Sequence, residues 1–263
     1  MDGILKRNDA PDLFHQVEGA GPPVVLVHGV GASGASWDEI APMLAPGFTV
    51  LRLDLRGHGR SGHIAGALSL GDFARDVVDV MAAVGVPRAH VVGFSLGGMI
   101  AQALALDHAA HVDRLVLLSA VAGRTEQERA RVRERLEVLR TQGIAAITGA
   151  AQDRWFTDAF IAAHPDLVAK RMAELKANHP ASYAAAYTVF STSDLGERLH
   201  AIDRPTLVAT GEFDVGSNTR MARFMHAVIT GSELRILPGL KHSVLVEAPG
   251  TIAEMVRGFL ARP

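Results

Sequence analysis

Short, continuous apolar runs alternate with longer segments of helical spacing along most of the chain. The runs that predict strands buried on both faces are 23–27, 48–53, 88–94, 113–119, 205–210 and 233–237. Helical patterns lie between and after them, at 37–44, 70–84, 96–106, 217–229 and 249–260. Strict alternation of strand and helix with short connections predicts an α/β fold: a mostly parallel, doubly wound sheet with helices on both faces.

Local signals mark where several of these helices begin. Ser69 with Asp72 has the spacing of a capping box, and so has Ser36 with Glu39, which predicts a helix from Trp37 to about Leu44. Pro249 suits the first turn of the last helix. Before all of these elements, 4–7 and 13–17 are two weaker strand candidates.

The alternation stops at residue 123 and resumes near residue 205. The patterns between these points are helical, at 126–140, 144–156, 165–177 and 181–192. The charged run 129–135 is interpreted as part of a solvated amphipathic helix rather than a basic patch, because glutamates and apolar residues are interleaved with its arginines. We therefore predict a core domain in two parts, 1–122 and 196–263, with a helical cap, 123–195, inserted between them.

Composition narrows the class of protein further. The 263 residues carry a formal charge of −2, which gives no electrostatic reason to expect a nucleic-acid or anionic-membrane partner. The absence of cysteine excludes disulfides, thiolate catalysis and cysteine–zinc sites. The first residues lack the apolar region of a signal peptide, and no apolar run is long enough to span a membrane. The expectation is a cytoplasmic protein.

One predicted strand–helix connection carries a serine between glycines. Gly93, Ser95 and Gly97 form the G-x-S-x-G pattern, after the strand at 88–94 and before the helix at 96–106. A serine raised on so tight a turn needs neighbours without Cβ atoms where strand and helix approach closely. The helix directs its free N–H groups to the place where negative charge would develop. Ser95 is the candidate nucleophile; an ordinary strand-to-helix turn is the alternative.

A serine hydroxyl becomes a strong nucleophile only when a base takes its proton. His242 directly follows the last predicted strand, 233–237, and so belongs to the same sheet edge as Ser95. His28 and His58 also follow strands, but both lie in glycine-rich turns, where a structural hydrogen bond accounts for them. We predict His242 as the base.

The base needs a carboxylate to orient it. Glu212 and Asp214 both follow the strand at 205–210 and are the two candidates. Asp54 lies in a turn, where bonds to the backbone are expected.

Stabilising the oxyanion requires N–H donors. The backbone N–H of Leu96, just after the nucleophile, is one candidate. The N–H of Val30, in the loop after the strand at 23–27, is the second.

With these residues identified, the chain resembles the α/β-hydrolase superfamily over nearly its full length. The resemblance rests on five features in register: His28-Gly29-x-Gly31, Asp54-x-Arg56-Gly57-His58-Gly59-x-Ser61, Gly93-x-Ser95-x-Gly97-Gly98, Asp214 and His242. The chain order Ser95, Asp214, His242 is that of the superfamily, and it favours Asp214 over Glu212, which then has a supporting or salt-bridging role.

Within the superfamily the chain is most similar to the 3-oxoadipate enol-lactonases. The segments that carry this likeness are Arg154-Trp155-Phe156-Thr157-x-x-Phe160 and Asp194-Leu195-x-Glu197-Arg198-Leu199. The acid loop, 211–218, lacks the proline-rich continuation of those enzymes, and the base loop, 241–247, is less polar than theirs. Both loops line the expected site, so the substrate can differ while the chemistry stays the same.

The resemblance implies cofactor-free hydrolysis of a small ester or lactone by a Ser95–His242–Asp214 triad, within the catabolism of aromatic compounds. The alternatives are C–C bond hydrolysis, a perhydrolase reaction, or a ligand receptor that keeps the triad. Trp155 and Phe156 are candidates for the cap wall over the substrate, with packing inside the cap as the alternative. If the substrate carries a carboxylate, the available cations are Arg154, Arg124, Arg171 and Lys176, with a solvated surface charge as the alternative for each.

Overall fold

The eight-stranded sheet at the centre of the molecule follows the predicted alternation. The computed structural model describes residues 1–64 and 66–262, and its strand order is β1-β2-β4-β3-β5-β6-β7-β8. The strands are β1 (Asp2–Leu5), β2 (Leu13–Gly19), β3 (Pro23–Val27), β4 (Thr49–Leu53), β5 (Ala89–Phe94), β6 (Val112–Leu118), β7 (Thr206–Gly211) and β8 (Glu233–Leu237). From β4 to β8 in this order every pair is parallel, while β1 and β2 pair antiparallel at one edge. The predicted α/β fold class is confirmed.

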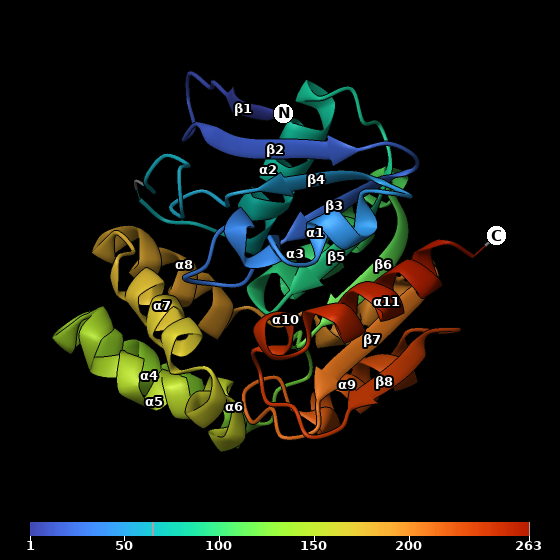
Figure 1. Ribbon diagram of the computed structural model, residues 1–263. Coiled ribbons are helices and arrows are strands. Elements are labelled where there is room, and N and C mark those ends of the chain that lie inside the picture. The colour runs from blue at the N-terminus through green and yellow to red at the C-terminus, as the bar shows by residue number, and fades with distance from the viewer. Residues whose placement is uncertain (65, 263) are drawn as a thin grey trace.

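Helices cover both faces of the sheet (Figure 1). They are α1 (Ala41–Leu44), α2 (Leu70–Ala83), α3 (Leu96–Asp107), α9 (Thr219–Val228), α10 (Val244–Glu247) and α11 (Pro249–Leu260). Side chains of α2, α3 and α9 share one core cluster, and those of α1, α10 and α11 share a second cluster on the opposite face. A sheet buried on both sides requires apolar strands throughout, which is why its central strands read as continuous apolar runs.

The helix starts are partly as predicted. The capping box of α2 is present, with the Asp72 N–H donating to Ser69 Oγ and the Ser69 N–H donating to the Asp72 carboxylate. The predicted capping box at Ser36 is wrong: residues Gly34–Trp37 form a separate 3-10 helix and α1 begins only at Ala41. Pro42 explains the break, because proline has no N–H to continue a helix but fits a first turn.

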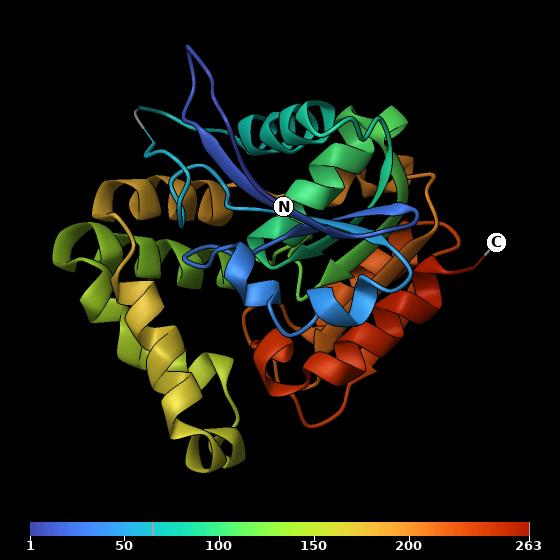
Figure 2. The same cartoon turned by 45° about the horizontal axis from the view of Figure 1, so that its top comes forward.

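Between β6 and β7 the chain forms the group that we call the cap helices. They are α4 (Glu126–Gln142), α5 (Ile144–Trp155), α6 (Asp158–Ala163), α7 (Pro165–Lys176) and α8 (Pro180–Thr192). Figures 1 and 2 show them gathered beside the sheet, next to the loops that follow its parallel strands. The amphipathic interpretation of α4 is confirmed, because Val132, Leu136 and Leu139 are buried while its arginines lie on the outer side or at its edges.

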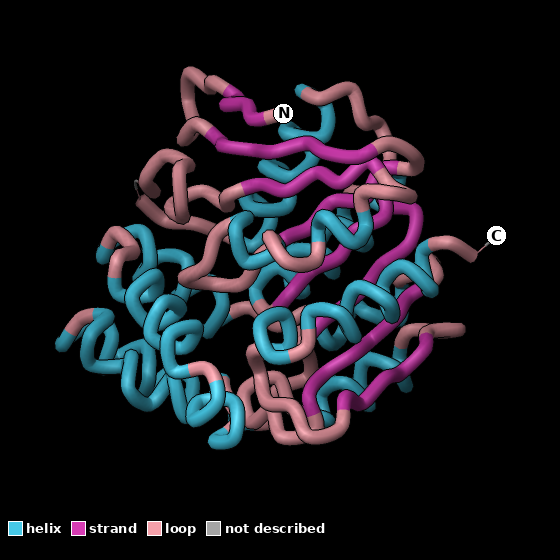
Figure 3. The backbone as a smooth tube through the Cα atoms, viewed as in Figure 1, coloured by secondary structure: helices cyan, strands magenta, loops and turns pink. Residues whose placement is uncertain are grey.

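The short helices are the main elements that the sequence pattern did not reveal. The helix α6 has 6 residues and α10 has 4, too few to show a helical period. Figure 3 shows both as brief coils, α6 between two longer cap helices and α10 just before the last helix. Within the described residues, no helix is long and apolar enough to cross a membrane.

Candidate active site

Ser95 occupies the turn between β5 and α3 in a strained backbone conformation. Its φ of 56° and ψ of −115° lie in a region that residues other than glycine rarely adopt. The start of α3 lies so close to the neighbouring strand β3 that a Cβ on Gly97 would lie 2.1 Å from the Val27 carbonyl oxygen. A Cβ on Gly93 would lie 2.2 Å from the Gly97 carbonyl oxygen. The glycines of the motif are therefore required by close backbone approach.

His242 and Asp214 meet beside this turn. The Nδ1 of His242 lies 2.7 Å from Asp214 Oδ2, while Asp214 Oδ1 accepts hydrogen bonds from the backbone N–H groups of Gly216 at 2.9 Å and Ser217 at 2.8 Å. Burial alone would raise the pKa of Asp214, but the charge and hydrogen bond of His242, with the two backbone donors, hold this pKa below its ordinary value. The carboxylate is thus ionised and saturated with donors.

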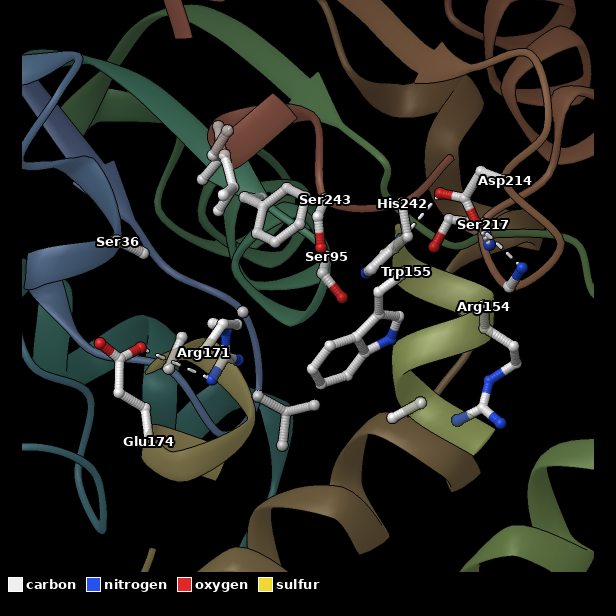
Figure 4. A pocket seen from close by; sticks show the side chains of 18 of the residues that line it. Ser36, Ser95, Arg154, Trp155, Arg171, Glu174, Asp214, Ser217, His242 and Ser243 are labelled. Atoms are coloured by element: carbon white, nitrogen blue, oxygen red, sulfur yellow. Dashed lines mark hydrogen bonds and ion pairs between the residues drawn. The ribbon is translucent and has the colours of Figure 1, made fainter. Parts of the chain in front are cut away.

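Ser95 and His242 line the same cavity, which lies between the sheet edge and the cap helices. It has a volume of about 460 Å³. Figure 4 shows the Ser95 hydroxyl and the His242 ring pointing into this space, with Asp214 behind the ring. Among the described residues no hydrogen bond joins Ser95 to His242; such contacts commonly tighten only when a substrate is bound.

Two backbone donors face the region of Ser95. Among the described residues, neither the Val30 N–H nor the Leu96 N–H has a hydrogen-bond acceptor. Val30 lines the cavity, and Leu96 is the first residue of α3, where N–H groups have no partner inside the helix. Within the described residues, both N–H groups are thus left without an acceptor.

The competing histidines make structural contacts. His28 Nδ1 lies 2.8 Å from the Gly29 carbonyl oxygen, and its Nε2 accepts the Leu55 N–H at 3.0 Å. His58 Nδ1 lies 3.0 Å from the Arg56 carbonyl oxygen. Burial lowers the pKa of His28 to about 4 and that of His58 to about 3, so both rings are neutral at pH 7.

The other acidic candidates bind backbone groups. Asp54 accepts the N–H groups of Gly34 and Arg60, each at 2.7 Å, as expected for a turn aspartate. Glu212 is exposed and accepts the Gly239 N–H at 2.9 Å, so it supports the connection after β8 rather than the His242 ring.

The two aromatic candidates for the cap wall lie in different environments. Trp155 lines the cavity, with its ring centroid 6.3 Å from that of His242. Phe156 is not among the lining residues: it is fully buried among Val168, Met172 and Phe160 within the cap helices. The expectation that Phe156 contacts substrate is thus corrected. Trp155 is the last residue of α5 and Phe156 follows it with an extended backbone, so the two rings point in different directions.

The four candidate cations also separate. Arg154 and Arg171 line the cavity, whereas Arg124 donates to the carbonyl oxygens of Phe190 and Ser193 away from it, and Lys176 is exposed outside it. Arg135 and Lys170 line the cavity as well, and sequence reasoning missed both. Helical spacing shows which face Arg135 occupies on α4 but not that this face meets a cavity.

The cap helices are fastened to the loops on both sides of Ser95. On one side, the Gly31 carbonyl oxygen, next to Val30, accepts a hydrogen bond from Arg171 Nη1 at 2.9 Å and another from Asn178 Nδ2 at 3.2 Å. On the other side, the Ser243 N–H donates to the Trp155 carbonyl oxygen at 2.9 Å.

A second bond strengthens the attachment on the His242 side, where Thr157 Oγ1 donates to Glu247 Oε2 at 2.7 Å. We call these contacts, on both sides, the cap anchors.

Comparison with known proteins agrees with this geometry. The family model described as "alpha/beta hydrolase fold" matches residues 22–249, and the chain belongs to this family. The 3-oxoadipate enol-lactonase 1 of Acinetobacter baylyi is 26% identical, over 98% of this chain and 96% of that protein.

Two solved structures are similar over nearly the whole chain. The enol-lactonase of Burkholderia xenovorans has a TM-score of 0.90 at 26% identity, covering 96% of this chain and 97% of that one. A hydrolase from Pseudomonas aeruginosa has a TM-score of 0.91 at 31% identity, covering 99% and 98%. The likeness expected from the sequence motifs is confirmed.

Proposed function

We propose that this protein is a serine hydrolase that cleaves a carboxylic ester or lactone through an acyl-enzyme. The observation that carries the proposal is the bond of 2.7 Å between His242 and Asp214, in a cavity shared with Ser95 on its strained turn. Enol-lactonases among the similar proteins support a lactone or ester as the substrate class.

The proposed reaction has two steps, acylation of Ser95 and hydrolysis of the acyl-enzyme, and His242 transfers protons in both. His242 Nε2 takes the proton of Ser95 Oγ as this oxygen attacks the substrate carbonyl, and the N–H groups of Val30 and Leu96 hold the oxyanion. His242 then gives its proton to the leaving alcohol. Water activated by His242 hydrolyses the acyl-enzyme and releases Ser95, while Asp214 keeps the proton on Nδ1 of the ring.

A substrate panel with Ser95→Ala tests the proposal. The parent should turn over p-nitrophenyl acetate and members of a lactone panel, and Ser95→Ala should lower kcat by about 10⁴-fold or more. Ser193 is a partly buried serine outside the cavity. Ser193→Ala is therefore the matched control and should keep the parental rate.

Labelling of Ser95 by a fluorophosphonate, located by peptide mass, gives an independent measure of nucleophilicity. Failure of the parent to hydrolyse any ester or lactone, together with no labelling, would favour a receptor role for the cavity. Parental turnover in folded Ser95→Ala would contradict the triad.

A further inference from the structure

Arg154 stands out among the cavity residues because no residue in the described part of the chain forms an ion pair with it, although the charge of Asp153 acts on it from farther away. Its guanidinium group carries five N–H donors, yet among the described residues it makes no hydrogen bond and no ion pair. The other cavity arginines each have an acceptor: Arg171 donates to the Gly31 carbonyl oxygen and Arg135 Nε donates to Tyr187 Oη at 3.2 Å. Figure 4 shows Arg154 and Arg171 on opposite sides of Trp155.

The surroundings make this lack of a partner costly. Arg154 is partly buried at the end of α5, and burial lowers its pKa, as does the neighbouring charge of Arg135. Two like charges thus face one region of the cavity, and Arg135 has only a neutral hydroxyl as partner. A half-buried cation pair without an acid is unfavourable unless an anion from outside completes it.

The chemistry of the walls narrows the anion. The cavity lining also includes the apolar side chains of Ile147, Ala151 and Phe190, so a substrate with an apolar body fits between its polar groups. The Tyr187 hydroxyl accepts from Arg135, which leaves its own proton free to donate. Two guanidinium groups and one hydroxyl supply donors that suit the two coplanar oxygens of a carboxylate.

We infer that Arg154, assisted by Arg135 and Tyr187, binds a carboxylate group of the substrate at a place in the cavity separate from Ser95. This inference rests on the proposed ester or lactone hydrolysis and narrows its substrate class to carboxylate-bearing molecules. The substrate would span the cavity, with its scissile carbonyl at Ser95 and its charged end beside Trp155.

Matched ester pairs test the charge requirement. One pair is mono-p-nitrophenyl glutarate and the isosteric ester in which an isopropyl group replaces the carboxylate; the other is phenyl acetate and its para-carboxylate. The measurement is the ratio of kcat/KM for the charged member to that for the neutral member. The parent should prefer the charged member of at least one pair, and Arg154→Gln should lower that ratio tenfold to a hundredfold.

The controls separate charge at the site from charge in general. Arg154→Lys keeps the positive charge and should restore part of the preference. Arg131→Gln removes an exposed arginine from α4, outside the cavity, and should keep the parental ratio. Added salt should reduce the parental ratio less than it would for a surface ion pair, because the site is partly enclosed.

Failure of this inference differs from failure of the proposed function. A parent that hydrolyses neutral esters at Ser95 but shows no preference in either pair, or a preference that Arg154→Gln leaves intact, overturns the carboxylate site alone. If the parent hydrolyses no ester, calorimetry on Ser95→Ala decides: glutarate binding that Arg154→Gln abolishes supports the site, and no glutarate binding overturns it.

Discussion

The two halves of the cavity are built differently. On the sheet side, the Asp214 carboxylate accepts bonds from two backbone N–H groups and His242, and the Ser95 N–H donates to the Leu118 carbonyl oxygen at 2.9 Å. On the cap side, Arg154 has no acceptor among the described residues.

We relate this difference to two proposed roles: the sheet side carries out the reaction and the cap side recognises the substrate. Groups that stabilise developing charge work best when the protein fixes them before the substrate arrives, because no reorganisation is then needed during the reaction. A recognition group can instead be completed by the ligand itself. On the sheet side the Asp214–His242 pair is already fixed without a substrate, whereas the carboxylate site that we infer on the cap side would gain its partner only on binding.

The largest effect is expected from removing the carboxylate of Asp214 on the sheet side of the cavity. Asp214→Asn should lower kcat on p-nitrophenyl acetate by about 10⁴-fold, because an amide cannot hold the proton of His242 on Nδ1. Glu212→Gln, on the same loop but outside the cavity, is the control. Thermal unfolding checks that the fold survives. A kcat within tenfold of the parent would remove Asp214 from the triad.

The junction between the two halves should give a smaller effect. Arg171→Gln loses the bond from the cap to the Gly31 carbonyl oxygen. Gly31 is next to Val30, whose N–H we propose as an oxyanion donor. We expect kcat to fall about tenfold with a smaller change in KM, because the lost contact positions a donor that acts in the transition state.

Lys176→Gln, on the exposed side of the same helix, is the matched control for this substitution. Arg171→Lys should recover part of the rate. A rise in KM at unchanged kcat would show instead that Arg171 contributes only to substrate binding.

Lowering the pH should reduce the free energy of unfolding through the buried histidines on the sheet side, and this is the smallest effect that we expect per residue. His28 and His58 stay neutral in the folded protein down to pKa values of about 4 and about 3, whereas in the unfolded chain they bind protons near pH 6.5. The unfolded state therefore binds more protons between about pH 6.5 and 4, and the free energy of unfolding falls as the pH falls through this window.

We expect a loss on the order of 1 kcal/mol or more per histidine, measured by urea unfolding at several pH values. His58→Asn should flatten this dependence, because it removes one of the two groups. An identical pH slope in parent and variant would show that His58 does not contribute.

The sheet side was largely predictable from the sequence, and the cap side was not. Ser95, Asp214 and His242 each follow a parallel strand, and such strand ends meet at one edge of the sheet whatever the loops do in detail. Arg154 and Arg124 look alike in sequence. They differ in their tertiary partners: Arg124 donates to two carbonyl oxygens, whereas Arg154 has no acceptor among the described residues.

The aromatic pair shows the same limit. Trp155 ends α5 and Phe156 directly follows it, and only the tertiary packing of this turn against α7 decides which of the two rings faces the cavity. The missing capping box at Ser36 had a sequence signal that was available, since Pro42 interrupts any helix that would start before it.

The cap anchors have a consequence for redesign. Arg171 and Asn178 bind the loop at Gly31, and Glu247 binds the chain after Trp155. Exchanging the cap helices alone would therefore lose the hydrogen bonds that hold the cap to these loops. A chimera that keeps its catalytic rate should carry residues 29–32 and 241–247 from the donor of the cap. Under the proposed function, substrate specificity would transfer only together with the two loops that carry Val30 and His242.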